Sequence, residues 1–313
     1  MKLELCHEIM ACLPQGRTIF RYGKDHYAFY LLRRAVAEGS TVARLRQSDF
    51  APLLEKPLVR AWLAGRGKGL IGPDDIPDPQ WRQDGIPYLL SLGIWGKDTT
   101  EWAYNQVSRR GASLVLHLNQ SNFKSRALPR FMAQCGKDPF SCYYHPEAGG
   151  MHPTIAWARL DIDLERREAL IEELQTDRIR FVQNAAKNAL RSQPGELVWC
   201  RSQKVKRETV LDYWEHEMKR HAAIWDEAML TATLDFLHRE IGIRRVFYHS
   251  FEGGCFLKHI RYSKPPRSLY TTLPRRFCFQ LTDEIPRMLA ECRTWKNRPA
   301  HKRRELRFHL LTT

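Results

Sequence analysis

The stretch TIAWARLDIDLERREALIEELQTDRIRFVQNAAKNALR, residues 154–191, contains the pattern that decides the fold. Two strand-like runs, 154–163 and 167–177, lie on either side of a short polar turn at 164–166, which predicts an antiparallel hairpin. Residues 178–191 then change to helical periodicity. A hairpin that passes directly into a helix indicates a chain of the α+β class.

The C-terminal side of this stretch continues with both kinds of element. Apolar residues recur every three or four positions through 209–241, which predicts one long helix that ends at Gly242. Strands are expected at 243–250, 275–281 and 304–311. The chain therefore returns to strands after the long helix.

The N-terminal side has helical patterns and one clear boundary. Residues 25–39 predict a helix, and residues 41–69 predict two or three short helices interrupted by prolines. Four prolines and two glycines fall within residues 72–87, which makes this segment the best candidate for a boundary. Residues 112–120 then predict a strand.

The length of the chain, 313 residues, suggests two domains. We expect a mainly helical domain at 1–98 and, at 99–313, an α+β domain built on a mixed, mostly antiparallel sheet with flanking helices. The composition is 43% hydrophobic and 11% aromatic, which is typical of a folded protein. No run approaches the roughly 18 apolar residues of a membrane span, so we expect a cytoplasmic protein without membrane contact.

The eight cysteines are scattered, with no CxxC pair and no regular spacing. This pattern indicates neither a disulfide framework nor a zinc ribbon, and we expect reduced, mostly buried thiols. His216 and His221 are five residues apart, which misses the i, i+4 spacing of helical metal ligands. The sequence therefore predicts no zinc site.

The charge of the chain is strongly positive and unevenly distributed. Fifty Lys and Arg against 35 Asp and Glu give a net charge of +15. Residues 244–309 contain sixteen basic and five acidic residues, whereas residues 161–177 contain seven acidic and two basic residues. A basic region beside an acidic strand is typical of a polyanion-binding surface next to a reactive site, and equally of charges that match within the molecule.

The second strand of the hairpin carries polar residues that strand formation does not require. Side chains of a strand point alternately to opposite faces, so Glu173, Gln175 and Asp177 are expected on one face at a spacing of roughly 7 Å. Like charges on one face raise the pKa of one group and favour acid–base chemistry or ligand binding. A salt-bridged strand face is the alternative, and Asp177 also stands where a helix N-cap is expected.

Other candidate residues lie towards the C-terminus. His249 is near the end of the strand expected at 243–250, a position that often lines a site, although a structural histidine fits equally. A set of cations interleaved with aromatic residues suits phosphate contacts and base stacking. The set consists of Arg244, Arg245, Lys258, Arg261, Lys264, Arg267, Arg275 and Arg276, to which the tail adds Lys302, Arg303 and Arg304.

Several segments resemble an uncharacterised family of bacterial proteins. They are LPQGRTIFRYGKDHYAFYLL (13–32), NQVSRRGASLVLHLNQSN (105–122), TIAWARLDID and ALIEELQTD. In that family the strand typically reads Glu-Ile-Gln-Ser-Asp, where this chain has Glu173, Leu174, Gln175, Thr176 and Asp177. Related segments look like parts of phage and mobile-element proteins, and this similarity implies a setting rather than a chemistry.

The order of hairpin, helix, strand and LYTTLPRRFCF (269–279) is similar to the core of the GNAT N-acyltransferases. This resemblance implies that Tyr270 acts as general acid, that Glu173 acts as base, and that acetyl-CoA or another acyl-CoA is the cofactor. Those enzymes bind the acyl-CoA pyrophosphate at a glycine-bearing turn before the helix. Here the turn TDRIRFVQNAAKN (176–188) has no glycine, and Cys278 replaces the glycine expected in RRFCF.

The first functional hypothesis is a GNAT-like acyltransferase that acts on an amine, with a nucleic-acid-associated amine among the substrates it includes. Its candidate catalytic residues are Glu173, Gln175, Asp177, Tyr270 and His249. Its candidate cofactor-binding residues are Arg275, Arg276 and Lys258. The phosphates of the cofactor require such cations.

The second hypothesis is a non-catalytic protein of a mobile element or phage-defence system that binds DNA or RNA. Its candidate nucleic-acid-binding residues are Arg244, Arg245, Arg261, Lys264, Arg267, Lys302, Arg303 and Arg304. A third possibility is that the acidic row of the strand binds a divalent ion.

Overall fold

The computed structural model describes residues 1–13, 18–66, 69–78, 84–96, 106–121, 127–135, 138–142, 144–148, 152–297 and 299–313. Its helices are α1 (Leu3–Cys12), α2 (His26–Ala35), α3 (Val42–Leu45), α4 (Ala51–Leu54), α5 (Pro57–Ala64), α6 (Ala127–Cys135), α7 (Arg178–Arg191), α8 (Arg207–Tyr213), α9 (Lys219–Ala222), α10 (Trp225–Asp235), α11 (Phe251–Leu257), α12 (Thr272–Arg276), α13 (Arg287–Ala290), α14 (Arg293–Lys296) and α15 (Ala300–Glu305). Its strands are β1 (Thr18–Tyr22), β2 (Ile86–Trp95), β3 (Ser113–Gln120), β4 (Thr154–Asp163), β5 (Glu168–Gln175), β6 (Leu197–Cys200), β7 (Gln203–Lys206), β8 (Arg245–His249), β9 (Gln280–Thr282) and β10 (Phe308–Thr312).

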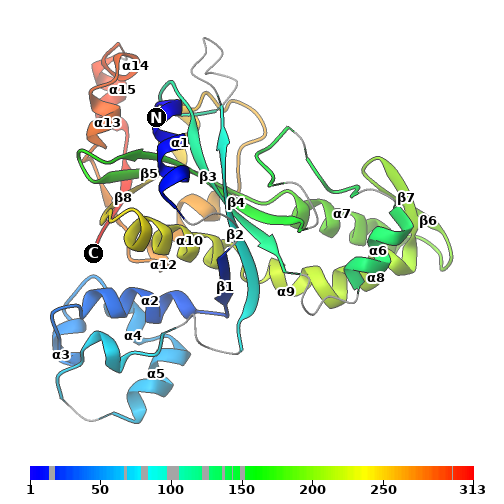
Figure 1. Cartoon of the computed structure of the whole chain (residues 1–313), viewed down its shortest axis with the longest axis horizontal. Coiled ribbons are helices and arrows are strands. Elements are labelled where there is room, and N and C mark those ends of the chain that lie inside the picture. Colours follow the sequence, from blue (N-terminus) through cyan, green and yellow to red (C-terminus); the bar gives the residue numbers. More distant parts are fainter. Residues whose placement is uncertain are drawn as a thin grey trace.

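Eight of these strands form one sheet at the centre of the molecule (Figure 1). The strand order is β1-β2-β3-β4-β5-β8-β10-β9, and β6 pairs with β7 in a separate hairpin. Within the described residues, β5 and β8 run parallel and the other neighbours in the large sheet run antiparallel. The prediction of an α+β chain with a mixed, mostly antiparallel sheet is confirmed.

The β4–β5 hairpin contains an irregularity that positions the polar residues of β5. Arg159 pairs with Glu173 and Leu160 pairs with Ile171, so Glu172 is an extra residue in β5 and forms a β-bulge. The parallel pairing of β5 with β8 ends at Ile171 and Tyr248, immediately before this bulge. The two strands therefore pair only up to the point at which β5 bends.

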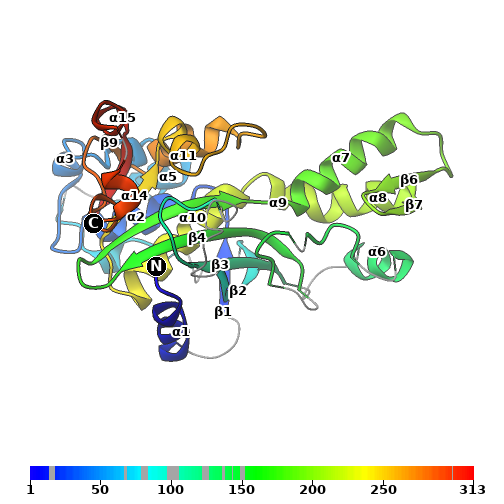
Figure 2. The ribbon, with the colours of Figure 1, turned by 90° about the horizontal axis from the view of Figure 1, so that it is seen from above.

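The helix predicted at 178–191 is α7, with the expected bounds. Together with α6, α8 and the β6–β7 hairpin, α7 extends away from one end of the sheet, as Figures 1 and 2 both show. Stacked rings of Phe131, Phe140 and Tyr213 hold this extension together, with ring centroids 5.4 and 4.7 Å apart. The buried Arg178 side chain forms an ion pair with Asp138 beside them.

The centre of the sheet is buried on both faces. Ile171, Val246 and Tyr248 belong to one large hydrophobic core, which includes residues of α10. Leu170 and Phe247, the alternate residues of β5 and β8, belong to a second core with residues of α11, α13 and α14. Each fully buried side chain of this kind contributes roughly 1.5–3 kcal/mol. Burial on both faces explains the consecutive apolar residues at 169–171 in β5 and 246–248 in β8.

Helices α2 to α5 form a helical lobe that is inserted between β1 and β2 (Figure 1). The region predicted as a mainly helical domain, 1–98, therefore also supplies two strands to the common sheet. The buried Glu227 carboxylate of α10 holds the start of this lobe, since it accepts hydrogen bonds from Tyr22 Oη at 3.1 Å and Lys24 Nζ at 2.6 Å. The lobe is thus joined to the sheet by packing and by buried polar contacts.

The long helix predicted at 209–241 is interrupted. The chain forms α8, a π-helical turn at Trp214–Met218, α9, α10 and a second π-helical turn at Phe236–Glu240. Ile224, between α9 and α10, has a φ of −139°, which lies outside the helical region and separates the two helices. The spacing of the apolar residues in the sequence does not predict such a break.

The strands predicted at 275–281 and 304–311 are shorter than expected. Cys278 has a φ of +62°, a left-handed conformation that ends α12 and excludes a strand until β9. Residues up to Glu305 belong to α15, and β10 begins at Phe308.

Among the residues that the structure describes, no helix combines the length and the apolar character that a membrane span requires.

Candidate functional site

A polar cleft of about 130 Å³ lies over β4 and the end of β5. It is lined by Trp95, Gln106, Tyr144, His145, Pro146, Trp157, Arg159, Glu173 and Gln175. Two cross-strand pairs of the hairpin, Trp157 with Gln175 and Arg159 with Glu173, contribute four of these residues. Residues 144–146 come from the segment before β4. The hairpin therefore supplies one wall of the cleft, and a loop supplies another.

Arg159 and Glu173 form a buried ion pair in this cleft. Arg159 Nη2 binds Oε2 of Glu173 and also donates a hydrogen bond to the backbone oxygen of Gln106 at 2.9 Å. Burial opposes ionisation of Glu173, but attraction by Arg159 and Lys258 outweighs it, so that the pKa of this carboxyl is lowered. Glu173 is therefore ionised at neutral pH.

Trp157, which lines the cleft, has an unused hydrogen-bond donor. Its indole Nε1 is buried and has no hydrogen-bond partner among the described residues. A buried donor without a partner costs about 1–3 kcal/mol. The Trp157 ring lies 6.0 Å from the His145 ring, between centroids.

The bulge residue Glu172 lies at the centre of a second, fully buried polar network. Its carboxylate accepts hydrogen bonds from the backbone N–H of Ser108 at 3.0 Å and from Ser108 Oγ at 2.8 Å. His249 Nε2 lies 3.1 Å from the same carboxylate. Burial raises the pKa of Glu172. Hydrogen bonding to His249 and attraction by His249 and Lys258 lower it by more than burial raises it, so that the pKa is about 2.

Lys258 and Tyr270 are buried where β5 and β8 separate. Lys258 Nζ donates a hydrogen bond to the backbone oxygen of the bulge residue Glu172 at 2.8 Å and lies 5.7 Å from the centre of the Tyr270 ring. Burial lowers the pKa of Lys258, although Glu173 opposes this effect. Burial and the nearby Tyr248 and Glu173 raise the pKa of Tyr270 well above its usual value. The Tyr270 hydroxyl has no hydrogen-bond partner among the described residues.

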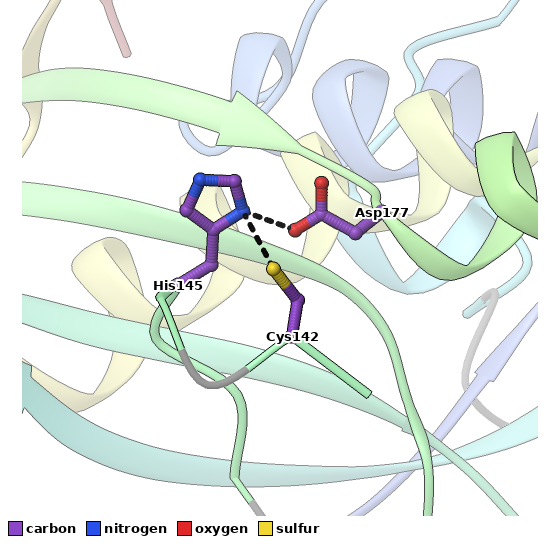
Figure 3. A group of neighbouring side chains, drawn as sticks. All are labelled: Cys142, His145 and Asp177. Atoms are coloured by element: carbon purple, nitrogen blue, oxygen red, sulfur yellow. Dashed lines mark hydrogen bonds and ion pairs between the residues drawn. The ribbon is translucent and has the colours of Figure 1, made fainter. Parts of the chain in front are cut away.

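A third group of polar side chains converges at the end of β5 (Figure 3). Nδ1 of His145 lies 2.5 Å from Oδ2 of Asp177, 3.1 Å from Nε2 of Gln175 and 3.7 Å from Sγ of Cys142. Burial opposes ionisation of Asp177, but hydrogen bonding and attraction by His145 lower its pKa overall. Burial, followed by the charge of Asp177, raises the pKa of the Cys142 thiol. Among the described residues, Cys142, His145 and Asp177 form a group that could hold a metal ion, since one ligand atom of each lies within 4.8 Å of the others.

The candidate catalytic residues from the sequence thus fall into two neighbouring places. Glu173, Tyr270 and His249 lie around the bulge. Gln175 and Asp177 lie with His145 instead. Asp177 occupies the N-cap position of α7 but makes no capping hydrogen bond with its side chain.

The predicted cations are mostly engaged within the molecule or dispersed. Arg245 is paired with Glu284, Arg267 with Glu252, and Arg276 with Glu227, while Lys258 is buried. Arg303 is half-buried. The exposed members are Arg244, Arg261, Lys264, Arg267 and Arg275. The side chains of Lys302 and Arg304 lie outside the described residues.

Sequence reasoning missed Ser108, Arg159, Glu172, Cys142 and His145. Glu172 is the extra residue of the bulge, which alternation along a strand does not predict, and Ser108 binds its carboxylate. Arg159 lies opposite Glu173 in the hairpin, a register that the sequence does not give. Cys142 and His145 are separated by two residues in a loop, and this spacing is a weak signal that could have suggested metal ligands. Their third partner, Asp177, is distant in the sequence.

Comparisons of the chain with protein-family models, with curated proteins and with solved structures found no match.

Proposed function

We propose that the protein is a GNAT-like enzyme that transfers an acyl group to an amine beside the bulge of β5. One observation carries the proposal: β5 and β8 are parallel neighbours that pair from Glu168 to Ile171, and their pairing ends beside the bulge, near the polar cleft that Glu173 lines. A parallel pair within an otherwise antiparallel sheet supports the topological resemblance to N-acyltransferases. The end of this pairing is the proposed place at which an acyl group enters.

The cleft offers suitable groups for an amine. Glu173 is ionised at neutral pH, and Arg159 binds its oxygen Oε2. A carboxylate attracts a protonated amine, and the rings of Trp95 and Trp157 add favourable cation–π contacts. We propose that Glu173 and Gln175 orient the amine and that Glu173 accepts its proton. The neutral amine then attacks the thioester carbonyl, and the thiolate of CoA leaves and takes a proton from Tyr270.

Tyr270 remains the proposed proton donor. Its raised pKa keeps the hydroxyl protonated at neutral pH, as a general acid requires. The hydroxyl is buried behind Lys258, so an acyl donor has to displace the Lys258 side chain to reach it. Entry of the donor is therefore proposed as a step that opens the space between β5 and β8.

An acyl-CoA is the proposed donor, although its phosphates cannot bind at α7 as they do in GNAT enzymes. The N-terminus of α7 carries the carboxylate of Asp177, which repels a pyrophosphate. Exposed cations such as Arg261, Lys264 and Arg275 are the proposed phosphate contacts.

Substitution of Glu173→Gln is the test of this function. We expect acyl transfer from acyl-CoA to a panel of primary amines, and a decrease in kcat/KM of about 10²- to 10⁴-fold in the variant because its side chain no longer attracts the amine. The measurement is the release of free CoA. Glu165→Gln is the matched control, since Glu165 is 89% exposed at the hairpin turn. No transfer to any amine, or an unchanged rate in the variant, would exclude the proposal.

Nucleic-acid binding is the second candidate function, and exposed basic and aromatic side chains favour it. Tyr262 is 87% exposed in the same loop as Arg261 and Lys264. On the exposed face of the β6–β7 hairpin, Trp199 pairs with Lys204 across the two strands. Exposed rings beside cations suit stacking of single-stranded bases and contacts to phosphates.

If the exposed face of the β6–β7 hairpin binds single-stranded nucleic acid, the affinity for the nucleic acid will fall steeply as salt is added. In a plot of the logarithm of the binding constant against the logarithm of the salt concentration, each lost phosphate contact makes the negative slope shallower by about 0.7. We expect Lys204→Gln to reduce the slope by this amount and Trp199→Ala to weaken binding by about 1–3 kcal/mol with little change in slope. Lys219→Gln on α9 is the control, because Lys219 is paired with Glu215. Fluorescence anisotropy with labelled oligonucleotides measures both, and salt-independent binding would contradict this candidate.

A further inference from the structure

Three atoms that can bind a metal ion meet at one point beside the end of β5. Nδ1 of His145 lies 2.5 Å from Oδ2 of Asp177 and 3.7 Å from Sγ of Cys142. Without an ion, a protonated Nδ1 donates a hydrogen bond to Asp177 Oδ2, while Gln175 Nε2 donates to Asp177 Oδ1 at 3.0 Å. In its other tautomer, Nδ1 turns a lone pair towards the same point, as a metal ligand does.

We infer that Cys142, His145 and Asp177 bind one divalent transition-metal ion, and that this ion is zinc. The donor atoms Sγ, Nδ1 and a carboxylate oxygen lie within 4.8 Å of one another. A cation at their centre accepts the lone pair of the imidazole and binds the carboxylate and the thiolate at once. This inference goes beyond the proposed acyl transfer and does not depend on it.

The spacing of the donors is close to that of a tetrahedral zinc site. Zinc binds sulfur at about 2.3 Å and nitrogen at about 2.0 Å, so two such ligands are about 3.5 Å apart in a tetrahedron. The distance between Cys142 Sγ and His145 Nδ1 is 3.7 Å. Asp177 Oδ2 is nearer to Nδ1, at 2.5 Å, and has to move by about 1 Å to reach the tetrahedral separation.

The neighbouring side chains hold Asp177 in the orientation that a ligand needs. Arg180 Nη2 and Gln175 Nε2 both donate hydrogen bonds to Oδ1, at 2.6 and 3.0 Å. Oδ2 is thereby left to point to Cys142 and His145, as Figure 3 shows. Such support of a ligating carboxylate is usual in metal sites.

The donor set selects for zinc over magnesium or calcium. Thiolate and imidazole are ligands for zinc and neighbouring transition metals, whereas the hard cations prefer oxygen ligands. Three protein ligands leave a fourth position, and His145 and Gln175 both line the polar cleft. The ion would thus lie beside the cleft, and a water molecule or a substrate could take the fourth position.

Cobalt(II) gives a test that requires no enzymatic turnover. The purified full-length chain, stripped with a chelator, is titrated with Co²⁺ alone and then with Zn²⁺ as competitor. We expect one ion per chain, a thiolate-to-cobalt charge-transfer absorption in the near ultraviolet, and displacement by an equivalent of zinc. Zinc should also raise the melting temperature, because the ion binds the native state.

Variants separate the site from adventitious binding. Cys142→Ser should abolish the charge-transfer absorption, and His145→Ala and Asp177→Asn should each weaken cobalt binding by at least about 10-fold. Cys135→Ser is the matched control, because Cys135 is a half-buried thiol on α6 outside the cluster. Thermal unfolding of each apo variant shows that it is folded. The inference is wrong if the wild type binds no stoichiometric cobalt, or if the absorption persists in Cys142→Ser.

Discussion

Acidification from pH 7 to pH 5 is expected to remove up to about 6 kcal/mol of the free energy of unfolding, because three histidines are buried in the neutral form. His221 contacts the Tyr88 hydroxyl at 3.0 Å, and His238 contacts the Tyr30 hydroxyl at 2.6 Å. His117 lies against the backbone oxygen of Ser91 at 3.2 Å. None of the three rings has a carboxylate among these neighbours to compensate a positive charge.

Burial is the main cause of the shift in each case. It lowers the pKa of His221 and of His238 from 6.5 to about 3, and that of His117 to about 4. A depressed pKa in the folded state means that the unfolded chain takes up the proton first. Stability is therefore fully present above pH 6.5 and is lost as the pH falls towards 3. Between pH 7 and pH 5 each histidine accounts for about 2 kcal/mol.

Urea denaturation at pH 7 and at pH 5 measures this effect. His221→Gln and His238→Gln should each reduce the difference between the two pH values by about 2 kcal/mol, whatever they do to stability at pH 7. His216→Gln is the control, because the His216 side chain is 72% exposed. Equal stability of the wild type at pH 7 and pH 5 would show that these rings are not held neutral.

The fold could be predicted where the local pattern and the packing agree. The hairpin at 154–163 and 168–175 and the helix Arg178–Arg191 follow from runs of strand residues, a polar turn and a change of period. The order of the strands in the sheet was not predictable in detail, because pairing of β5 with β8 depends on contacts between segments about 75 residues apart. The interruption at Ile224 is also set by tertiary packing rather than by propensity.

The candidate site could be predicted only in part for the same reason. Alternation along β5 places Glu173 and Gln175 together in the cleft. The rule of alternation fails at Glu172, because the extra residue of the bulge puts the residues before it out of step with those after it. Cys142 and His145 lie in a loop without periodicity, so their proximity to Asp177 is a consequence of the fold alone.

Removal of the Glu172 side chain is expected to have the largest effect of any single substitution near the site. Glu172→Ala leaves the backbone N–H of Ser108 and the ring of His249 without their carboxylate partner in a fully buried place. It also removes a negative charge that faces the buried ammonium of Lys258. Loss of one partner of a buried charge network costs about 3–5 kcal/mol, so we expect a decrease of this size in the free energy of unfolding.

Chemical denaturation at pH 7 tests this expectation, and a second substitution identifies its cause. Glu165→Ala, at the exposed turn of the same hairpin, should change stability by less than about 0.5 kcal/mol. In a double-mutant cycle, Glu172→Ala and His249→Ala should be non-additive by about 0.5–3 kcal/mol, because the second substitution removes a ring that the first has already left unpaired. Additive effects, or a loss below about 1 kcal/mol for Glu172→Ala, would mean that the network does not stabilise the separated ends of β5 and β8. The bulge would then be held by its apolar neighbours Ile171 and Leu174 instead.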